Sequence, residues 1–174
     1  MKKLIRNLTL FAAFVSCLSA CNGNEKVLAG EILLSDNWEV QSSAKITQDG
    51  QTLSGSGAST HGWYPATVPS TIMGVLTANG LYKDLLTGTN YKDADRTPFD
   101  VSWWYRTTFE LSPDNTGKHV KLLFHGLPYR AHVWPNGVQI ASKEDVSGAF
   151  CRFSFYITPD VQASNTLADE VFLA

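Results

Sequence analysis

The sequence predicts an all-β fold, a jelly-roll-like β-sandwich with one short helix. From Ile32 onward, apolar and polar residues mostly alternate, which is the period of a strand with one buried face. Turn residues separate the alternating stretches, and Asn136-Gly137 between two of them is the strongest short hairpin signal. With 174 residues, 44% of them apolar and 17% charged, the chain has the composition of a single folded domain.

The expected strands are short and follow one another closely. They cover residues 104–111, 120–124, 131–134, 138–142, 149–157 and 167–174. Adjacent side chains of a strand point to opposite faces, so one of the neighbours Asp169 and Glu170 should face inward. The last stretch ends in apolar residues, which predicts an edge strand or a chain that stops before the fold is complete.

One helix is expected over residues 71–79, with Ser70 as its cap and Gly80 at its end. Its apolar face consists of Ile72, Val75 and Leu76. The stretch 48–61 is rich in Gly, Ser and Thr and is expected to be a hairpin or a loop.

The first residues have the pattern of a secretory signal peptide. Three basic residues precede an apolar run, residues 8–20, which is shorter than the roughly 20 apolar residues that cross a bilayer. Cys21 follows small residues directly, as in bacterial lipoprotein signals, where a peptidase cuts before the cysteine and its thiol is lipidated. An ordinary signal peptide with a chance cysteine is the alternative.

We therefore expect a lipoprotein signal peptide over residues 1–20, a polar tether over residues 21–30 and the sandwich domain over residues 31–174. The protein would cross the inner membrane and be held by a lipid at Cys21 in the periplasm, at the outer membrane or on the cell surface. Removing the signal peptide removes three of the 14 basic residues and none of the 16 acidic ones, which leaves a net charge of −5. That charge argues against a nucleic-acid partner. Cys151, in an alternating stretch, is expected to be a small buried hydrophobe.

Three segments carry a resemblance to a known family. They read WYPATVPSTIMGVLTANGLYKDLLTGTN, FDVSWWYRTTFEL and KHVKLLFHGLPYRAHVWPNGVQIA. Together they resemble the N-terminal β-sandwich of glycoside hydrolase family 2, in the branch of exo-β-D-glucosaminidases and β-mannosidases. The resemblance extends roughly from Trp38 to Phe172.

The resemblance implies a galactose-binding-like domain that precedes an immunoglobulin-like domain and a (β/α)8 catalytic barrel. The family's two catalytic glutamates lie on the barrel, and no segment of this chain matches their motifs. We therefore expect no catalytic residue and no hydrolase activity in this chain alone. The implied partners are a β-linked glucosaminide or mannoside and, in an intact parent, the barrel. The branch also carries an Asp-Trp segment late in this domain, which is missing here, so the C-terminal end is expected to be incomplete.

Whether two carboxylates of this chain could catalyse glycoside hydrolysis can be judged without the family resemblance. A retaining glycosidase needs two carboxyl groups about 5–5.5 Å apart. Neighbours such as Asp169 and Glu170 diverge in an extended chain, and Asp93 and Asp95 lie in a polar stretch typical of a solvated turn. The four histidines show no metal-ligand spacing. We expect no metal and no cofactor.

The aromatic residues are more informative. Trp103 and Trp104 are adjacent, so one indole can enter the core while the other faces solvent, a sugar or a neighbouring domain. Packing or interface support is the commoner role for tryptophans in a sandwich. Asp100 leads the candidates because, in the wider family, a polar residue near this point reaches the active site. The full set of candidates for sugar binding or interdomain contact is Asp100, Trp103, Trp104, Tyr129, Arg130 and Trp134.

Three functions are consistent with these features. The first is the non-catalytic N-terminal domain of a family 2 glycosidase, which positions substrate and supports a catalytic barrel. The second is an independent carbohydrate-binding lipoprotein, and the third is a non-functional remnant of a truncated gene.

Overall fold

The computed structural model describes residues 30–115, 117–149 and 151–173. The chain divides at Leu33 into two units, and the second unit, Leu34–Ala174, contains all the strands and helices named below. The expected signal peptide, Cys21 and nearly all of the expected tether lie outside the described residues. In the part of the chain that is described, no helix is long and apolar enough to cross a membrane.

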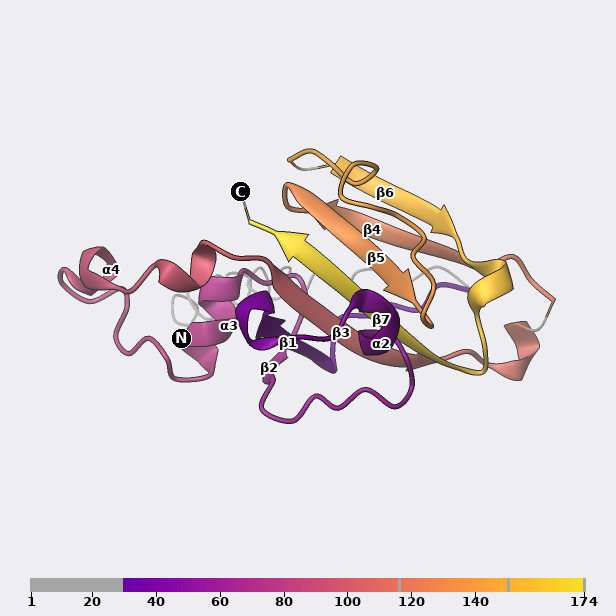
Figure 1. Ribbon diagram of the computed structural model, residues 1–174, viewed down its shortest axis with the longest axis horizontal. Coiled ribbons are helices and arrows are strands. Elements are labelled where there is room, and N and C mark those ends of the chain that lie inside the picture. Colours follow the sequence, from indigo (N-terminus) through magenta and orange to yellow (C-terminus); the bar gives the residue numbers. More distant parts are fainter. Residues whose placement is uncertain (1–29, 116, 150, 174) are drawn as a thin grey trace, which may run out of the picture. The chain divides into compact units, whose positions relative to one another are not determined.

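Two antiparallel sheets build the second unit, which confirms the all-β sandwich prediction (Figure 1). Sheet A has five strands in the order β2-β1-β3-β7-β5. They are β1 (Trp38–Ser42), β2 (Tyr64–Ala66), β3 (Trp103–Glu110), β7 (Ser164–Phe172) and β5 (Arg130–Pro135). Sheet B pairs β4 (Lys121–Leu127) with β6 (Cys151–Tyr156). The strand β7 is therefore interior, between β3 and β5, and not at an edge.

The expected strand over residues 138–142 is wrong. The turn before it forms, with Asn136 and Gly137 in the left-handed region at φ values of 47° and 85°. Beyond the turn, the chain meets β5 only at isolated bridges, between Ala141 and Val133 and between Ser147 and Arg130, and forms no continuous ladder. The side chain of Asn136 donates to Asp160 and Asn165 and accepts from the Thr166 N–H, so the turn is held against β7 instead of extending a ladder.

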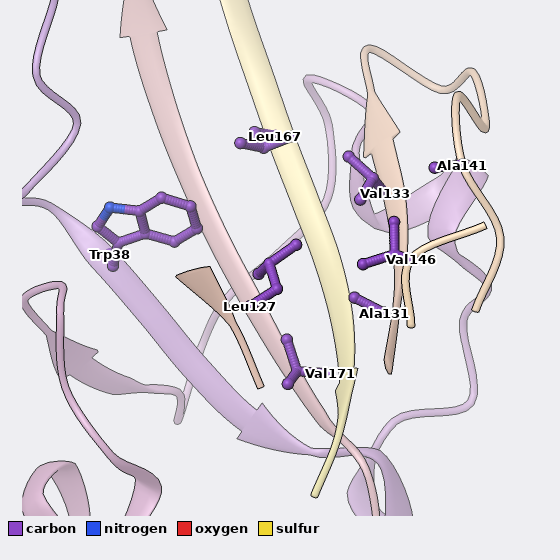
Figure 2. Packing of buried hydrophobic residues seen from close by; sticks show 8 residues of the cluster. All are labelled: Trp38, Leu127, Ala131, Val133, Ala141, Val146, Leu167 and Val171. Carbon is purple, nitrogen blue, oxygen red and sulfur yellow. The ribbon is translucent and has the colours of Figure 1, made fainter. Parts of the chain in front are cut away.

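The inner face of sheet A packs against sheet B. Alternate residues of β5 and β7 point to this face, because side chains of a strand alternate between its two sides. Figure 2 shows the central cluster, which consists of Trp38, Leu127, Ala131, Val133, Ala141, Val146, Leu167 and Val171. Aromatic residues of sheet B, among them Phe124 and Phe155, pack against it. This shared apolar layer holds the two sheets together.

A short helix packs against sheet A in a second apolar cluster, which contains Trp103 and Val40 of the sheet. The helix α3 (Ile72–Ala78) buries the three apolar residues that its period predicts. The expected cap at Ser70 is wrong by one residue, because the Thr71 side chain accepts from the Gly74 N–H at 3.1 Å.

The other face of sheet A, its outer face, is also covered. The helix α2 (Gly50–Leu53) lies within the stretch expected to be a hairpin or loop, and Leu53 packs with Trp63, Trp104 and Ala168. Another one-turn helix, α4 (Asn90–Asp93), lies between α3 and β3, so the described chain has three short helices where one was expected. Short 3₁₀ turns cover Ser43–Lys45, Thr97–Phe99, Pro113–Asn115 and Thr158–Asp160.

Because both faces of sheet A are covered, both of the adjacent tryptophans are buried. Trp103 is 2% exposed and Trp104 is 5% exposed, on opposite sides of the sheet. Both indoles are buried, so of the three surroundings expected for the outward indole, exposure to solvent is not found. Cys151 also differs from expectation, because it is exposed. It starts β6 at a register irregularity opposite Leu127, beyond the regular part of the ladder.

Candidate functional site

An open cleft of about 510 Å³ lies on the outer face of sheet A. The strand register explains its floor. Trp104 of β3 pairs with Glu170 of β7, and Glu170 pairs with His132 of β5, so these three side chains form one row on one face. Trp134 lies two residues beyond His132 and shares that face. Ser43 and residues 46–50 line the cleft beside them.

Two indoles form the apolar part of the cleft. Trp104 packs with Leu53 and Ala168, which leaves only part of its ring at the cleft. Trp134 lies directly over Gly50, where an added Cβ would come within 2.4 Å of the indole Nε1. Only glycine allows this approach, so residue 50 sets the position of Trp134.

The helix α2, which carries Gly50, is anchored from below. The Arg106 Nε donates to the Leu53 carbonyl at 2.9 Å, and burial lowers the pKa of its guanidinium. The Ser54 hydroxyl donates to the Gly50 carbonyl and accepts from the Gly137 N–H at 2.9 Å. The Asn136-Gly137 turn thus positions this wall of the cleft as well as reversing the chain.

Glu170 is held at one oxygen and open at the other. Its Oε1 accepts from the Ser102 hydroxyl at 2.6 Å. The Ser102 oxygen is 2.9 Å from the Ser43 Oγ, so Ser43 can donate in turn. Among the described residues, no hydrogen bond or ion pair occupies the Glu170 Oε2. One carboxylate oxygen is therefore available at the cleft.

The cleft is acidic. Asp49 caps α2, and the Thr52 backbone N–H that it accepts at 2.9 Å lowers its pKa, so it is ionised at neutral pH. With Glu170, it gives two carboxylates among the lining residues, which include no Lys or Arg. The His132 Nδ1 accepts from the Lys143 N–H at 3.1 Å, which places the proton of the neutral ring on Nε2.

Asp169 is separated from this site although it is the neighbour of Glu170. It is 2% exposed and faces the core between the sheets, as alternation requires for one of the pair. Its Oδ1 has no hydrogen-bond partner among the described residues, and burial raises its pKa well above the usual value. The two carboxyl groups cannot act together on one bond.

The structure brings together two of the six residues expected from sequence. Trp104 and Trp134 both line the cleft. Trp103 is in the opposite core, where its Nε1 donates to the Pro98 carbonyl at 2.7 Å. The remaining candidates, Asp100, Tyr129 and Arg130, are exposed outside the cleft lining.

Sequence reasoning missed Glu170, His132 and Asp49 as members of one site. Alternation in β7 does predict that Asp169 and Glu170 separate, and Asp is a favoured residue at a helix N-cap, as at Asp49. The pairing register that aligns three strands has no such local signal. Within the described ranges, no cluster of three or more His, Cys, Asp or Glu side chains could hold a metal ion.

Known proteins resemble this chain over almost the whole second unit. The family model described as "Glycosyl hydrolase 2 galactose-binding domain-like" matches residues 38–171. An exo-β-D-glucosaminidase from Amycolatopsis orientalis is 37% identical over 156 residues, which are 89% of this chain and 14% of that protein. One from Hypocrea jecorina is 37% identical over 147 residues, 83% of this chain and 16% of that protein. The chain thus spans about a seventh of the length of these relatives.

Solved structures agree. The crystal structure of the Amycolatopsis orientalis exo-chitosanase CsxA matches with a TM-score of 0.76 at 35% identity, over 82% of this chain and 17% of that one. A β-D-mannosidase from Dictyoglomus thermophilum matches with a TM-score of 0.63 at 23% identity, over 82% and 16%. The second match supports the fold alone.

Proposed function

Because the chain belongs to the galactose-binding-like domain family of glycoside hydrolase family 2, we propose that it is the non-catalytic N-terminal domain of a glycosidase. In this role it supports a catalytic barrel and positions substrate. The observation that carries the proposal is the match of residues 38–171 to one domain type, together with relatives of whose length the matched region is only 14–16%.

The substrate class follows from the more similar relatives. At 37% identity, the relatives are named exo-β-D-glucosaminidases, whereas the mannosidase is 23% identical. We therefore place this chain in an enzyme for β-glucosaminides and not mannosides, a choice that the sequence alone left open.

The positions of the carboxylates support a non-catalytic role. Asp169 is buried in the core while Glu170 faces the cleft. Asp145 accepts from the backbone and hydroxyl of Ser142 in an exposed turn, and Asp95 accepts from Thr97 in another. Asp145 and Asp95 thus serve as structural acceptors in exposed turns, and Asp169 and Glu170 lie on opposite faces of β7, where they cannot flank one glycosidic bond.

Two measurements test the proposal. The purified chain should not hydrolyse p-nitrophenyl β-D-glucosaminide, and turnover that tracks the pure protein would contradict it. A chimera of the Amycolatopsis orientalis enzyme that carries residues 38–171 in place of its matching domain should keep glucosaminidase activity. The same chimera with Leu167→Ala, which opens the core, is the control that should lose it. A well-folded but inactive chimera would argue against the domain assignment.

The export proposal is separate. We propose that Cys21 is lipidated after cleavage and that the mature protein stays attached to a membrane. The support is the order of basic start, apolar run and small residues before Cys21. Cells fed labelled fatty acid should incorporate label into the protein, and Cys21→Ser should abolish the label. Unchanged labelling of that variant, or none in the wild type, would refute lipidation.

A further inference from the structure

We propose that the cleft on the outer face of sheet A binds a protonated amino sugar residue. The proposal rests on the proposed function for its choice of ligand, and on the cleft itself for the binding chemistry. Such a ligand has an ammonium group, several hydroxyls and an apolar ring face. Each of these meets a matching group in the cleft.

The ammonium is matched by the acidic lining. Glu170 presents an oxygen that no described residue uses, and its other oxygen is fixed by the Ser102 hydroxyl at 2.6 Å. Asp49 adds a second negative charge, and no Lys or Arg lines the cleft to neutralise either one. An ammonium can therefore form a charge-assisted hydrogen bond with a carboxylate that is already oriented. An N-acetylated or neutral sugar lacks that group.

The apolar ring face is matched by Trp134. Its indole is half-buried and is held in position by Gly50. Stacking of a sugar on this ring therefore costs little side-chain conformational entropy. Trp104, in the row with Glu170, borders the cleft floor but is only 5% exposed, so Trp134 is the indole on which a sugar ring can stack. The amide of Gln139, which reaches the His132 Nδ1 at 3.0 Å, borders the same space and can exchange hydrogen bonds with hydroxyls.

The cleft has the size for such a ligand. A volume of about 510 Å³ is within the range of small-molecule sites. Its open form suits a residue at the end of, or within, an oligosaccharide, because the rest of the chain can leave the cleft without a clash.

The test is binding of glucosamine oligosaccharide to the 174-residue chain at about pH 6, where an amine with a pKa of about 8 is protonated. Calorimetry gives the affinity, and the indole N–H resonances locate the ligand. The comparison ligands are the N-acetylated oligosaccharide and a mannose oligosaccharide. Glu170→Gln keeps the acceptor for Ser102 and removes the charge, so we expect a loss of about tenfold in affinity for glucosamine oligosaccharide, the size of one charge-assisted hydrogen bond.

Matched variants distinguish a loss of binding at the cleft from a loss caused by misfolding. Trp134→Phe keeps an aromatic ring and should weaken binding of all sugars, while its near-ultraviolet dichroism reports folding. Glu144→Gln and Tyr156→Ala change an exposed carboxylate and an aromatic residue outside the cleft, and should change nothing.

The outcomes separate the two proposals. Two results together support the proposal that the cleft binds an amino sugar. The chain should prefer the glucosamine ligand and lose this preference in Glu170→Gln, and the ligand should shift an indole N–H resonance that is absent in Trp134→Phe. No binding by the folded chain, equal binding of the N-acetylated ligand, or insensitivity to both cleft variants overturns it. Each of these results is independent of the chimera, whose activity alone tests the proposed function.

Discussion

Replacing the buried carboxyl of Asp169 should change how stability depends on pH. Asp169 lies in the interior strand β7 and is 2% exposed, with Tyr105 and Val133 as its cross-strand neighbours. Burial raises its pKa well above the usual value, and burial also raises the pKa of Tyr105 to about 12, so that the phenol stays neutral. Asp169→Asn keeps the shape of the side chain and cannot ionise.

The sign follows from proton binding in the two states. Below the pKa of an unfolded aspartate, about 3.9, both states hold the proton and the carboxyl carries no penalty. As the pH rises above that value, the unfolded chain releases the proton before the folded one does. The free energy of unfolding therefore falls by up to about 1.4 kcal/mol per pH unit until the pH reaches the folded pKa. Asp169→Asn removes this fall.

Urea unfolding of both proteins across this range measures the effect. The stability of the variant relative to the wild type should rise steadily as the pH increases from about 4.5, by at most about 1.4 kcal/mol per pH unit, because contributions of all other groups cancel in the difference. Glu110→Gln, which removes an exposed carboxylate from β3, should show no such trend. A difference between Asp169→Asn and wild type that stays constant with pH would refute the argument that the core holds a neutral acid.

Three further substitutions test how the cleft is held. Arg106→Met leaves the carbonyls of the α2 segment without their buried donor and should destabilise by about 1–3 kcal/mol in urea unfolding, and an unchanged midpoint would contradict this role. Gly50→Ala places a methyl 2.4 Å from Trp134, so near-ultraviolet dichroism should show a displaced indole. The control is Gly57→Ala, because a Cβ added at Gly57 meets no atom within 4 Å. Asn136→Ala removes the side-chain hydrogen bonds that hold the turn and puts alanine at a left-handed backbone position. It should lower the free energy of unfolding by about 2–4 kcal/mol in thermal unfolding, more than Asn136→Gly does. Equal loss in both variants would show that the bonds alone matter.

Local patterns predicted much of the fold. Alternation located β3, β4, β5, β6 and β7 to within a few residues, and apolar spacing located α3. The exceptions have a physical cause. The stretch after the Asn136-Gly137 turn alternates like a strand, but it bonds to β5 only at isolated bridges, and the turn itself is held by side-chain bonds to β7 and Asp160. The helix α2 arises from a cap at Asp49 and burial of Leu53, in a stretch whose composition is typical of a loop.

The candidate site was less predictable than the fold. Trp104 and Trp134 were chosen for their chemistry, yet the sequence did not indicate that they share a cleft while Trp103 lies in the opposite core. The sequence predicted only that one of the neighbours Asp169 and Glu170 faces inward, without deciding which. Its meeting with Trp104 and His132 depends on the register of β3 with β7 and of β7 with β5.

By itself, the sequence determined the fold class, the family resemblance and which faces of the strands are apolar, because these depend on short-range periodicity and ordered motifs. Only the tertiary structure decided which polar side chains gather at the cleft and which carboxyl enters the core. That decision requires the pairing register of strands far apart in the chain, and a shift of one residue would exchange Glu170 for Asp169 at the cleft.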